Sequence, residues 1–238
     1  LAEDLAAVHN GGGCSLLAKW MPSINSASKN SRELARKFIQ YWGFSNQRYR
    51  LLLSRLRRQI DIVESYMSAN EWDKINFENL PSRAAMLYSD AFAKHCLESY
   101  TQYLTEVAQG ESKINAAALF PVDIINKVMS APDCLKNRIL YDALWKALPD
   151  YFEGLNETGI CVVDTSGSMT WTNLKGNITP LKVALSLGLY CADKAKGPFA
   201  NHFITFSGSP ELQEITGENI FEKISCMQHT NWGVNTNV

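Results

Sequence analysis

Three oxygen-bearing side chains alternate in one short segment of the chain. Asp164, Ser166 and Ser168 occupy every second position of Asp164-Thr-Ser-Gly-Ser-Met169. One carboxylate and two hydroxyls are hard oxygen ligands with little negative charge, which suits Mg²⁺ or Mn²⁺ ions that keep several waters. A turn that caps the next helix uses the same residue types. The spacing therefore leaves two interpretations open, a divalent-metal site and a structural turn.

A buried strand and a helix are expected to position this segment. Before it, Gly159-Ile-Cys-Val-Val163 is a continuous apolar, β-branched run, typical of a strand covered on both faces of a parallel sheet. Open α/β sheets bind ligands at the C-terminal ends of such strands. After it, Thr179 and Pro180 predict the start of a helix that continues to about Lys196.

The residues that follow extend this pattern. Strands are expected over 202–206 and 211–215, and a helix over 219–226. The order strand, helix, strand, strand, helix favours an open α/β sheet. Strands that would complete such a sheet do not follow before Val238, so we expect the chain to be a fragment of a longer protein.

Residues 1–150 have a different hydrophobic pattern, because their apolar residues recur at the helical spacing of three and four. Ser31 is expected to cap a helix that ends near Gly43, and Ser45 to begin a long helix that reaches Val63. We expect a bundle or a solenoid of stacked helical pairs over 1–150, and part of an α/β domain over 158–238. Further helices are expected over 82–95, 98–109, 114–119, 122–130 and 134–148.

The strongest charge bias lies in residues 29–58, within a chain whose net charge is -1. These basic residues could neutralise RNA phosphates, while Tyr41, Trp42 and Tyr49 could stack on bases. Salt bridges, solvated helix faces and a packed aromatic core would explain the same residues, so both interpretations stay open. Against a single acidic residue, Glu33, the stretch holds Lys29, Arg32, Arg36, Lys37, Arg48, Arg50, Arg55, Arg57 and Arg58.

Composition and motifs argue against several other classes of protein. No apolar run approaches the roughly 20 residues that span a bilayer, so we expect a soluble, cytoplasmic protein that does not bind membranes. The six cysteines include no CxxC pair, which favours free thiols in a reducing compartment over disulfides or a zinc site. Neither a GxSxG elbow nor a phosphate-binding Gly-x4-Gly-Lys-Ser/Thr loop is present. We therefore expect no catalytic residues and no enzymatic activity.

The segment Val162-Val-Asp-Thr-Ser-Gly-Ser-Met169 resembles the first motif of the metal-ion-dependent adhesion site of von Willebrand factor A domains. A threonine in a later loop is the second motif of that family, and Asn235-Thr236-Asn237 resembles it. The resemblance implies a Rossmann-like domain that holds Mg²⁺ or Mn²⁺ through Asp164, Ser166, Ser168 and Thr236. The third motif, an Asp on a later loop, is expected beyond Val238.

Three segments of the first half resemble Ro-like proteins, in which a TROVE-type helical module precedes a von Willebrand A domain. They are Leu16-Leu-Ala-Lys-Trp-Met-Pro-Ser23, Tyr49-Arg-Leu-Leu-Leu-Ser-Arg-Leu-Arg57 and Lys113-Ile-Asn-Ala-Ala-Ala-Leu-Phe-Pro121. The greatest similarity is to a Ro-related group of phages, giant viruses and some eukaryotes. The resemblance implies HEAT-like helical repeats that bind structured or single-stranded RNA. The alternative is a scaffold without RNA, in which a protein partner supplies an acidic ligand to the metal.

Overall fold

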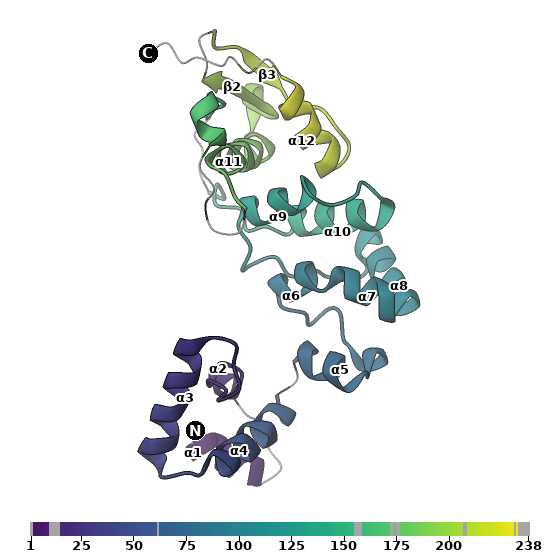
Figure 1. The fold of residues 1–238 in the computed structure, drawn as a ribbon. Coiled ribbons are helices and arrows are strands. Elements are labelled where there is room, and N and C mark those ends of the chain that lie inside the picture. The colour runs from purple at the N-terminus through teal and green to yellow at the C-terminus, as the bar shows by residue number, and fades with distance from the viewer. Residues whose placement is uncertain are drawn as a thin grey trace. The chain divides into compact units, whose positions relative to one another are not determined.

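The computed structural model describes residues 2–9, 15–60, 62–154, 159–171, 174, 177–206, 209–230 and 232 (Figure 1). Helices make up most of this part of the chain, and a three-stranded sheet is formed by residues between Cys161 and Glu214. The fold therefore has the α plus α/β character that we expected from the sequence. The chain divides into two compact units, residues 1–75 and 76–238, and each is described by itself below.

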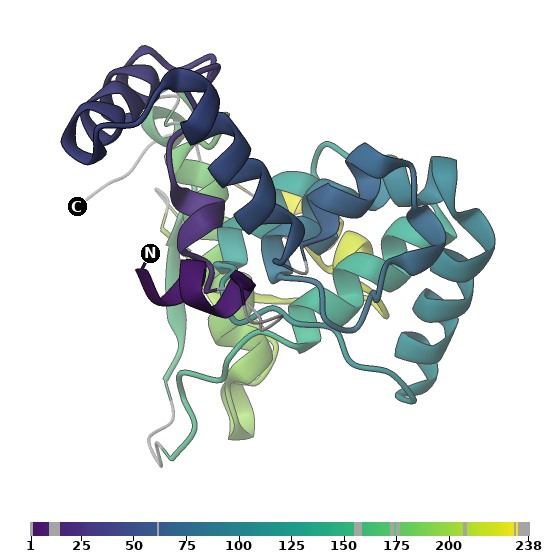
Figure 2. The same cartoon turned by 90° about the horizontal axis from the view of Figure 1, so that it is seen from below.

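Helices are the only regular secondary structure in the described part of the first unit. They are purple to dark blue in Figure 2. Serines cap its two longest helices, since Ser28 Oγ accepts from the Ser31 N–H and Ser45 Oγ from the Arg48 N–H. Gly43 ends α3 in the left-handed conformation. The helices are α1 (Ala2–His9), α2 (Leu17–Trp20), α3 (Lys29–Trp42), α4 (Asn46–Arg58) and α5 (Val63–Ala69), and the 3₁₀ turn η1 (Trp72–Lys74) follows.

Two of the expected helix limits in this unit are wrong. The first helix begins at Lys29 and is capped by Ser28, so Ser31 lies inside its first turn. The long helix expected to reach Val63 ends at Arg58, because the Gln59 N–H turns to the Leu56 carbonyl in a tighter, three-residue bond. Val63 instead begins α5.

The core of the first unit forms where α2, α3 and α4 meet. Tyr49, Leu53 and Leu56 lie on one face of α4 and pack with Ala35 and Ile39 of α3. The Tyr49 hydroxyl donates to the Pro22 carbonyl at 2.9 Å, which satisfies its polar end inside this core.

Five helices open the second unit, and an aromatic cluster lies among them. Phe77 is within 5.5 Å of the ring centres of Phe92, Tyr100 and Tyr103. The helix expected over 82–95 is broken at Tyr88 into two shorter helices. The helices are α6 (Ser82–Leu87), α7 (Ser89–His95), α8 (Leu97–Gln109), α9 (Pro121–Val128) and α10 (Leu135–Lys146).

The helix expected over 114–119 is a turn instead. The Asn115 side-chain oxygen accepts bonds from the Ala117 N–H and from the Ser82 hydroxyl, both at 2.9 Å. Such a side-chain bond offers the backbone an alternative to the helix. Pro121 then starts α9, where its missing N–H carries no cost.

The sheet orders its strands β1-β2-β3 (Figure 1). β1 (Cys161–Asp164) pairs in parallel with β2 (His202–Phe206), and α11 (Pro180–Lys194) forms the crossover between them. β3 (Leu212–Glu214) pairs antiparallel with β2. The remaining elements are α12 (Ile220–His229) and the 3₁₀ turns η2 (Gly167–Thr170) and η3 (Gly197–Phe199).

Helices cover only one face of this sheet in the described part of the chain. Val163 and Phe203 are buried on the face against α11, whereas Val162 on the opposite face is 54% exposed. The expectation that the first strand is covered on both faces is therefore wrong for these residues. α11 lies very close to β1, because a Cβ added at Gly188 would overlap Val163 Cγ2.

Candidate functional site

The sequence of alternating oxygen ligands lies where β1 ends. Asp164 is the last residue of the strand, and its Oδ1 accepts a bond from the Ser166 N–H at 2.9 Å. The hydroxyls of Ser166 and Ser168 are 3.1 Å apart. Ser166 is buried and Ser168 is exposed at the start of η2. The structure thus brings three of the four expected metal ligands together, while Thr236 lies outside the described residues.

These contacts agree with both interpretations of the segment. The bond from Ser166 to Asp164 forms an Asx turn, which is the structural alternative. The same turn also places one carboxylate and two hydroxyls next to each other, a donor set that fits Mg²⁺ with several waters. The neighbouring Thr165 hydroxyl is buried and has no hydrogen-bond partner among the residues that the structure describes. Within the described residues, no three His, Cys, Asp or Glu side chains gather as a metal site, so any site here depends on these hydroxyls.

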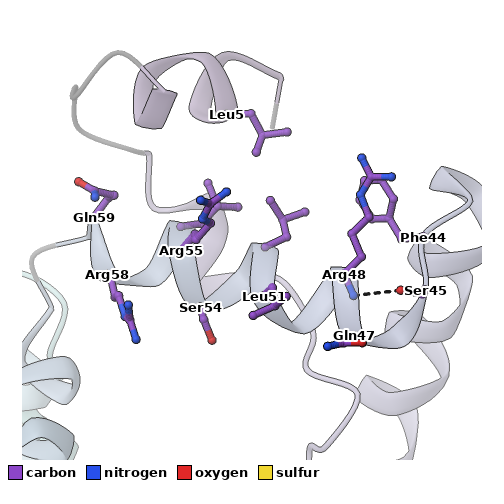
Figure 3. Close-up of a pocket in the computed structure, with 12 residues that line it drawn as sticks. Leu5, Phe44, Ser45, Gln47, Arg48, Leu51, Ser54, Arg55, Arg58 and Gln59 are labelled. Atoms are coloured by element: carbon purple, nitrogen blue, oxygen red, sulfur yellow. Dashed lines mark hydrogen bonds between the residues drawn. The ribbon is translucent and has the colours of Figure 1, made fainter.

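A second candidate site is a basic cavity in the first unit (Figure 3). It has a volume of about 1190 Å³ and lies along α4, with Leu5 of α1 facing that helix. Arg48, Arg55 and Arg58 line it, and its described lining contains no acidic residue. The other lining residues are polar or apolar, namely Leu5, Phe44, Ser45, Gln47, Leu51, Leu52, Ser54, Leu56 and Gln59.

Helical spacing explains why two of these arginines share a surface. Arg48 and Arg55 are seven residues apart and lie on one stripe of α4, with Leu51 and Leu52 between them. In Figure 3 Arg48 and Arg55 extend toward the side of α1, and Arg58 extends from the opposite side of the helix. The Arg48 guanidinium lies 4.8 Å from the ring centre of Phe44, a cation–π contact at the edge of the cavity.

Three of the nine basic residues have structural contacts instead. Arg57 donates to the carbonyls of Ala18 and Met21 and to Ser23 Oγ, at 3.0, 2.7 and 3.0 Å. Arg32 donates to two carbonyls of the loop before α3, and Lys29 forms an exposed ion pair with Glu33. These residues therefore follow the structural interpretation of the basic stretch.

The other six basic residues are exposed, and no ion pair to any of them is seen in the described part of the chain. Only three of the six line the cavity. Arg36 and Lys37 are on α3, and Arg50 is on α4 outside the cavity lining. The structure thus singles out Arg48, Arg55 and Arg58 from the larger basic set.

The three aromatic residues expected to stack on bases differ in accessibility. Tyr49 is completely buried, so it belongs to the core and is not available for stacking. Trp42 stacks on Phe38 with ring centres 5.0 Å apart, whereas Tyr41 is 84% exposed. The sequence interpretation missed Trp20, which is 77% exposed at the end of α2, and Phe44 beneath Arg48. The only sequence signal for Trp20 was its place beside Met21-Pro22, where helical periodicity stops.

Two family models match the chain. The Domain of unknown function (DUF2828) matches residues 1–153, and the Domain of unknown function (DUF7788) matches residues 158–238. The chain belongs to the DUF2828 family. The DUF2828 region includes the basic cavity and the helices through α10, whereas the DUF7788 region includes the sheet, α11, α12 and the Asp164 turn. The division between the two compact units, at residue 75, falls inside the DUF2828 region.

One curated relative is similar over the whole chain. The DUF2828 chain is 30% identical, over 262 aligned residues, to the "Uncharacterized protein L728" of Acanthamoeba polyphaga mimivirus. All of the chain is covered by this match, but it spans only 44% of the length of the viral protein. No solved structure matches the chain. None of the described helices is both long and apolar enough to cross a membrane.

Proposed function

We propose that this chain binds RNA through the cavity beside α4. The observation that carries the proposal is the lining of that cavity, which includes three arginines but no acidic residue and no ion pair among the described contacts. Guanidinium groups bind phosphate oxygens in a bidentate manner, and a site without carboxylates does not repel the RNA backbone. The resemblance of the helical region to Ro-like modules with HEAT-like repeats points to the same ligand class.

The apolar part of the cavity complements this charge. Leu51 and Leu5 provide apolar surface between the arginines, and Phe44 lies under Arg48. Phosphates would contact the guanidinium groups while sugars or unstacked bases contact this surface. Three neutralised phosphates on a single strand correspond to a slope of roughly -2 in log affinity against log salt. Binding of this kind is therefore expected to weaken steeply as salt increases.

A salt titration with fluorescent single-stranded and structured RNA tests the proposal. The triple substitution Arg48→Glu, Arg55→Glu and Arg58→Glu is expected to lower affinity by at least about tenfold and to flatten the salt slope. Arg36→Glu with Lys37→Glu is the matched control, because it reverses exposed charges that do not line the cavity. Affinity that is equal in the triple variant and the wild type, or a larger loss in the control, would rule out this site.

A metal-dependent protein interaction at the end of β1 is the second candidate function. It is favoured by the 3.1 Å separation of the Ser166 and Ser168 hydroxyls beside the Asp164 carboxylate. These residues would hold Mg²⁺ or Mn²⁺, and the bound ion would supply an open coordination position for an acidic side chain of a protein partner. Thr236 would add a further oxygen if the resemblance to the adhesion-type site holds at that position.

Electron paramagnetic resonance of Mn²⁺ tests the metal site without requiring the partner. Titration of the wild type is expected to deplete the free-ion signal, and Asp164→Ala is expected to abolish this depletion. Ser168→Ala is expected to weaken it while leaving the Asx turn intact, because that turn uses only Asp164 and Ser166. If all three proteins leave the free-ion signal unchanged, the segment is a structural turn.

A further inference from the structure

Two cysteines far apart in the sequence meet beneath the sheet. Cys161 is the first residue of β1, and Cys191 lies in the last two turns of α11. The two thiols interact with each other across the contact between β1 and α11, and both side chains are half-buried. Neither residue belongs to the candidate metal site or to the basic cavity, so this pair needs an explanation of its own.

The packing of α11 on β1 accounts for the contact. Side chains alternate along a strand, so Cys161 points to the same face as Val163, which is the face covered by α11. At Gly188 the absence of a side chain lets the helix approach Val163 closely. Cys191 follows Gly188 by nearly one helical turn, and Cys161 precedes Val163 by two strand residues. The close approach at Gly188 therefore brings the two sulfurs together as well.

We propose that Cys161 and Cys191 are a redox modification site, at which a peroxide converts the two thiols into a reversible disulfide. This inference does not depend on RNA or metal binding. It concerns two thiols that interact across the contact between β1 and α11. Covalent closure would fix the two ends of residues 161–191, the segment that contains Asp164, Ser166 and Ser168.

The chemistry assigns different roles to the two sulfurs. The contact with Cys161 lowers the pKa of Cys191 to about 7, while the same contact and burial raise the pKa of Cys161. The Cys191 thiolate would attack one peroxide oxygen and break the O–O bond, which gives a sulfenic acid and, after protonation, water. Cys161 would then lose its proton and attack that sulfur, which expels the hydroxyl as a second water. Overall, two thiols and one hydrogen peroxide give one disulfide and two waters.

No contact with a second thiol is seen for the other described cysteines. Burial raises the pKa of Cys96, and its contact is with Ser99. Cys226 Sγ contacts the Thr216 N–H and the Glu214 carbonyl. Cys134 is exposed at the start of α10 and provides an accessible comparison for reactivity.

Peptide mapping of the whole chain after oxidation tests the proposal. The protein is treated with a small excess of hydrogen peroxide, remaining thiols are blocked with iodoacetamide, and trypsin digestion follows without reductant. Cleavage gives peptides 147–175 and 183–194, each of which contains one cysteine of the pair. We expect these two peptides to be joined as the main disulfide product and to separate after dithiothreitol.

Single variants distinguish the roles and provide the control. Cys161→Ser is expected to prevent the link and to leave a sulfenic acid at Cys191 that dimedone traps. Cys191→Ser is expected to leave Cys161 reduced, and Cys96→Ser is expected to form the link as the wild type does. The proposal is overturned if both cysteines of the wild type remain alkylated after peroxide, or if Cys191 pairs instead with Cys134 or with a second chain.

Discussion

The Asp142 carboxylate of α10 accepts a hydrogen bond from the backbone N–H of Ile220, the first residue of α12, at 2.6 Å. A side chain from the DUF2828 region therefore caps a helix of the DUF7788 region within one compact unit. Asn219 caps the same helix by accepting from the Glu222 N–H. The two matched regions thus depend on each other locally, although separate family models describe them.

Two substitutions of Asp142 distinguish the contribution of its hydrogen bond to stability from the contribution of its charge. Asp142→Ala removes the acceptor and is expected to lower the free energy of unfolding by about 1 kcal/mol. Asp142→Asn keeps an oxygen acceptor for Ile220, so this loss is not expected in that variant. Urea unfolding of the two variants beside the wild type measures the difference. Equal losses in both variants would mean that the charge, not the acceptor, matters.

The pH dependence of the Asp142 variants has a defined sign. Burial is the main reason why the pKa of Asp142 is raised in the folded chain. Its ionised form is therefore less favourable in the folded than in the unfolded state, and stability falls as pH rises through the folded pKa. Asp142→Asn is expected to gain melting temperature relative to the wild type at pH 7 and to lose that gain near pH 3. A gain that grows on acidification would contradict this.

Arg57 and Arg55 are expected to differ although they are neighbours on one helix. Arg57→Ala removes three hydrogen bonds to the segment 18–23 and is expected to destabilise the first unit by about 2 kcal/mol. Arg55→Ala is exposed and is expected to change stability by less than about 0.5 kcal/mol. Hydrogen exchange of residues 16–24 should accelerate in Arg57→Ala only. If the cavity binds RNA, Arg55→Ala should flatten the salt dependence of RNA binding more than Arg57→Ala does.

The interaction between the Cys161 and Cys191 thiols also has a consequence in the absence of peroxide. Cys161→Ala removes the neighbouring thiol that lowers the pKa of Cys191, so the thiolate fraction of Cys191 at pH 7 should fall. Alkylation of Cys191 by iodoacetamide is expected to slow by about tenfold. The rate at Cys134 in the same sample is the internal reference. An unchanged rate at Cys191 would mean that Cys161 does not activate it.

Gly188→Ala tests the close packing of α11 on β1. Alanine improves helix propensity by about 1 kcal/mol, but its methyl group would overlap Val163 Cγ2 in a buried strand. We expect a net destabilisation of about 1–2 kcal/mol by thermal unfolding. Val163→Ala in the same chain should recover part of that loss. If Gly188→Ala is more stable than the wild type, α11 can move away from β1 without loss of packing, and the close contact is not required.

Local sequence signals predicted the elements that depend on short-range chemistry. The apolar run before Asp164 is β1, and Thr179 with Pro180 starts α11. Features that depend on distant contacts were not predictable in the same way. The break at Tyr88 and the structural use of Arg57 arise from packing between segments, and no periodicity in the sequence encodes those partners. For the candidate site, spacing predicted the neighbouring oxygens of Ser166 and Ser168, but it did not separate three cavity arginines from six others.

The contact between Gly188 and Val163 also constrains how the DUF7788 region of related chains can change over evolution. A residue with a side chain at 188 requires less volume at 163, and a larger residue at 163 requires glycine at 188. Related sequences are therefore expected to vary at these two positions together. Because the same spacing holds Cys161 against Cys191, lineages that lose Gly188 should also lose the paired cysteines.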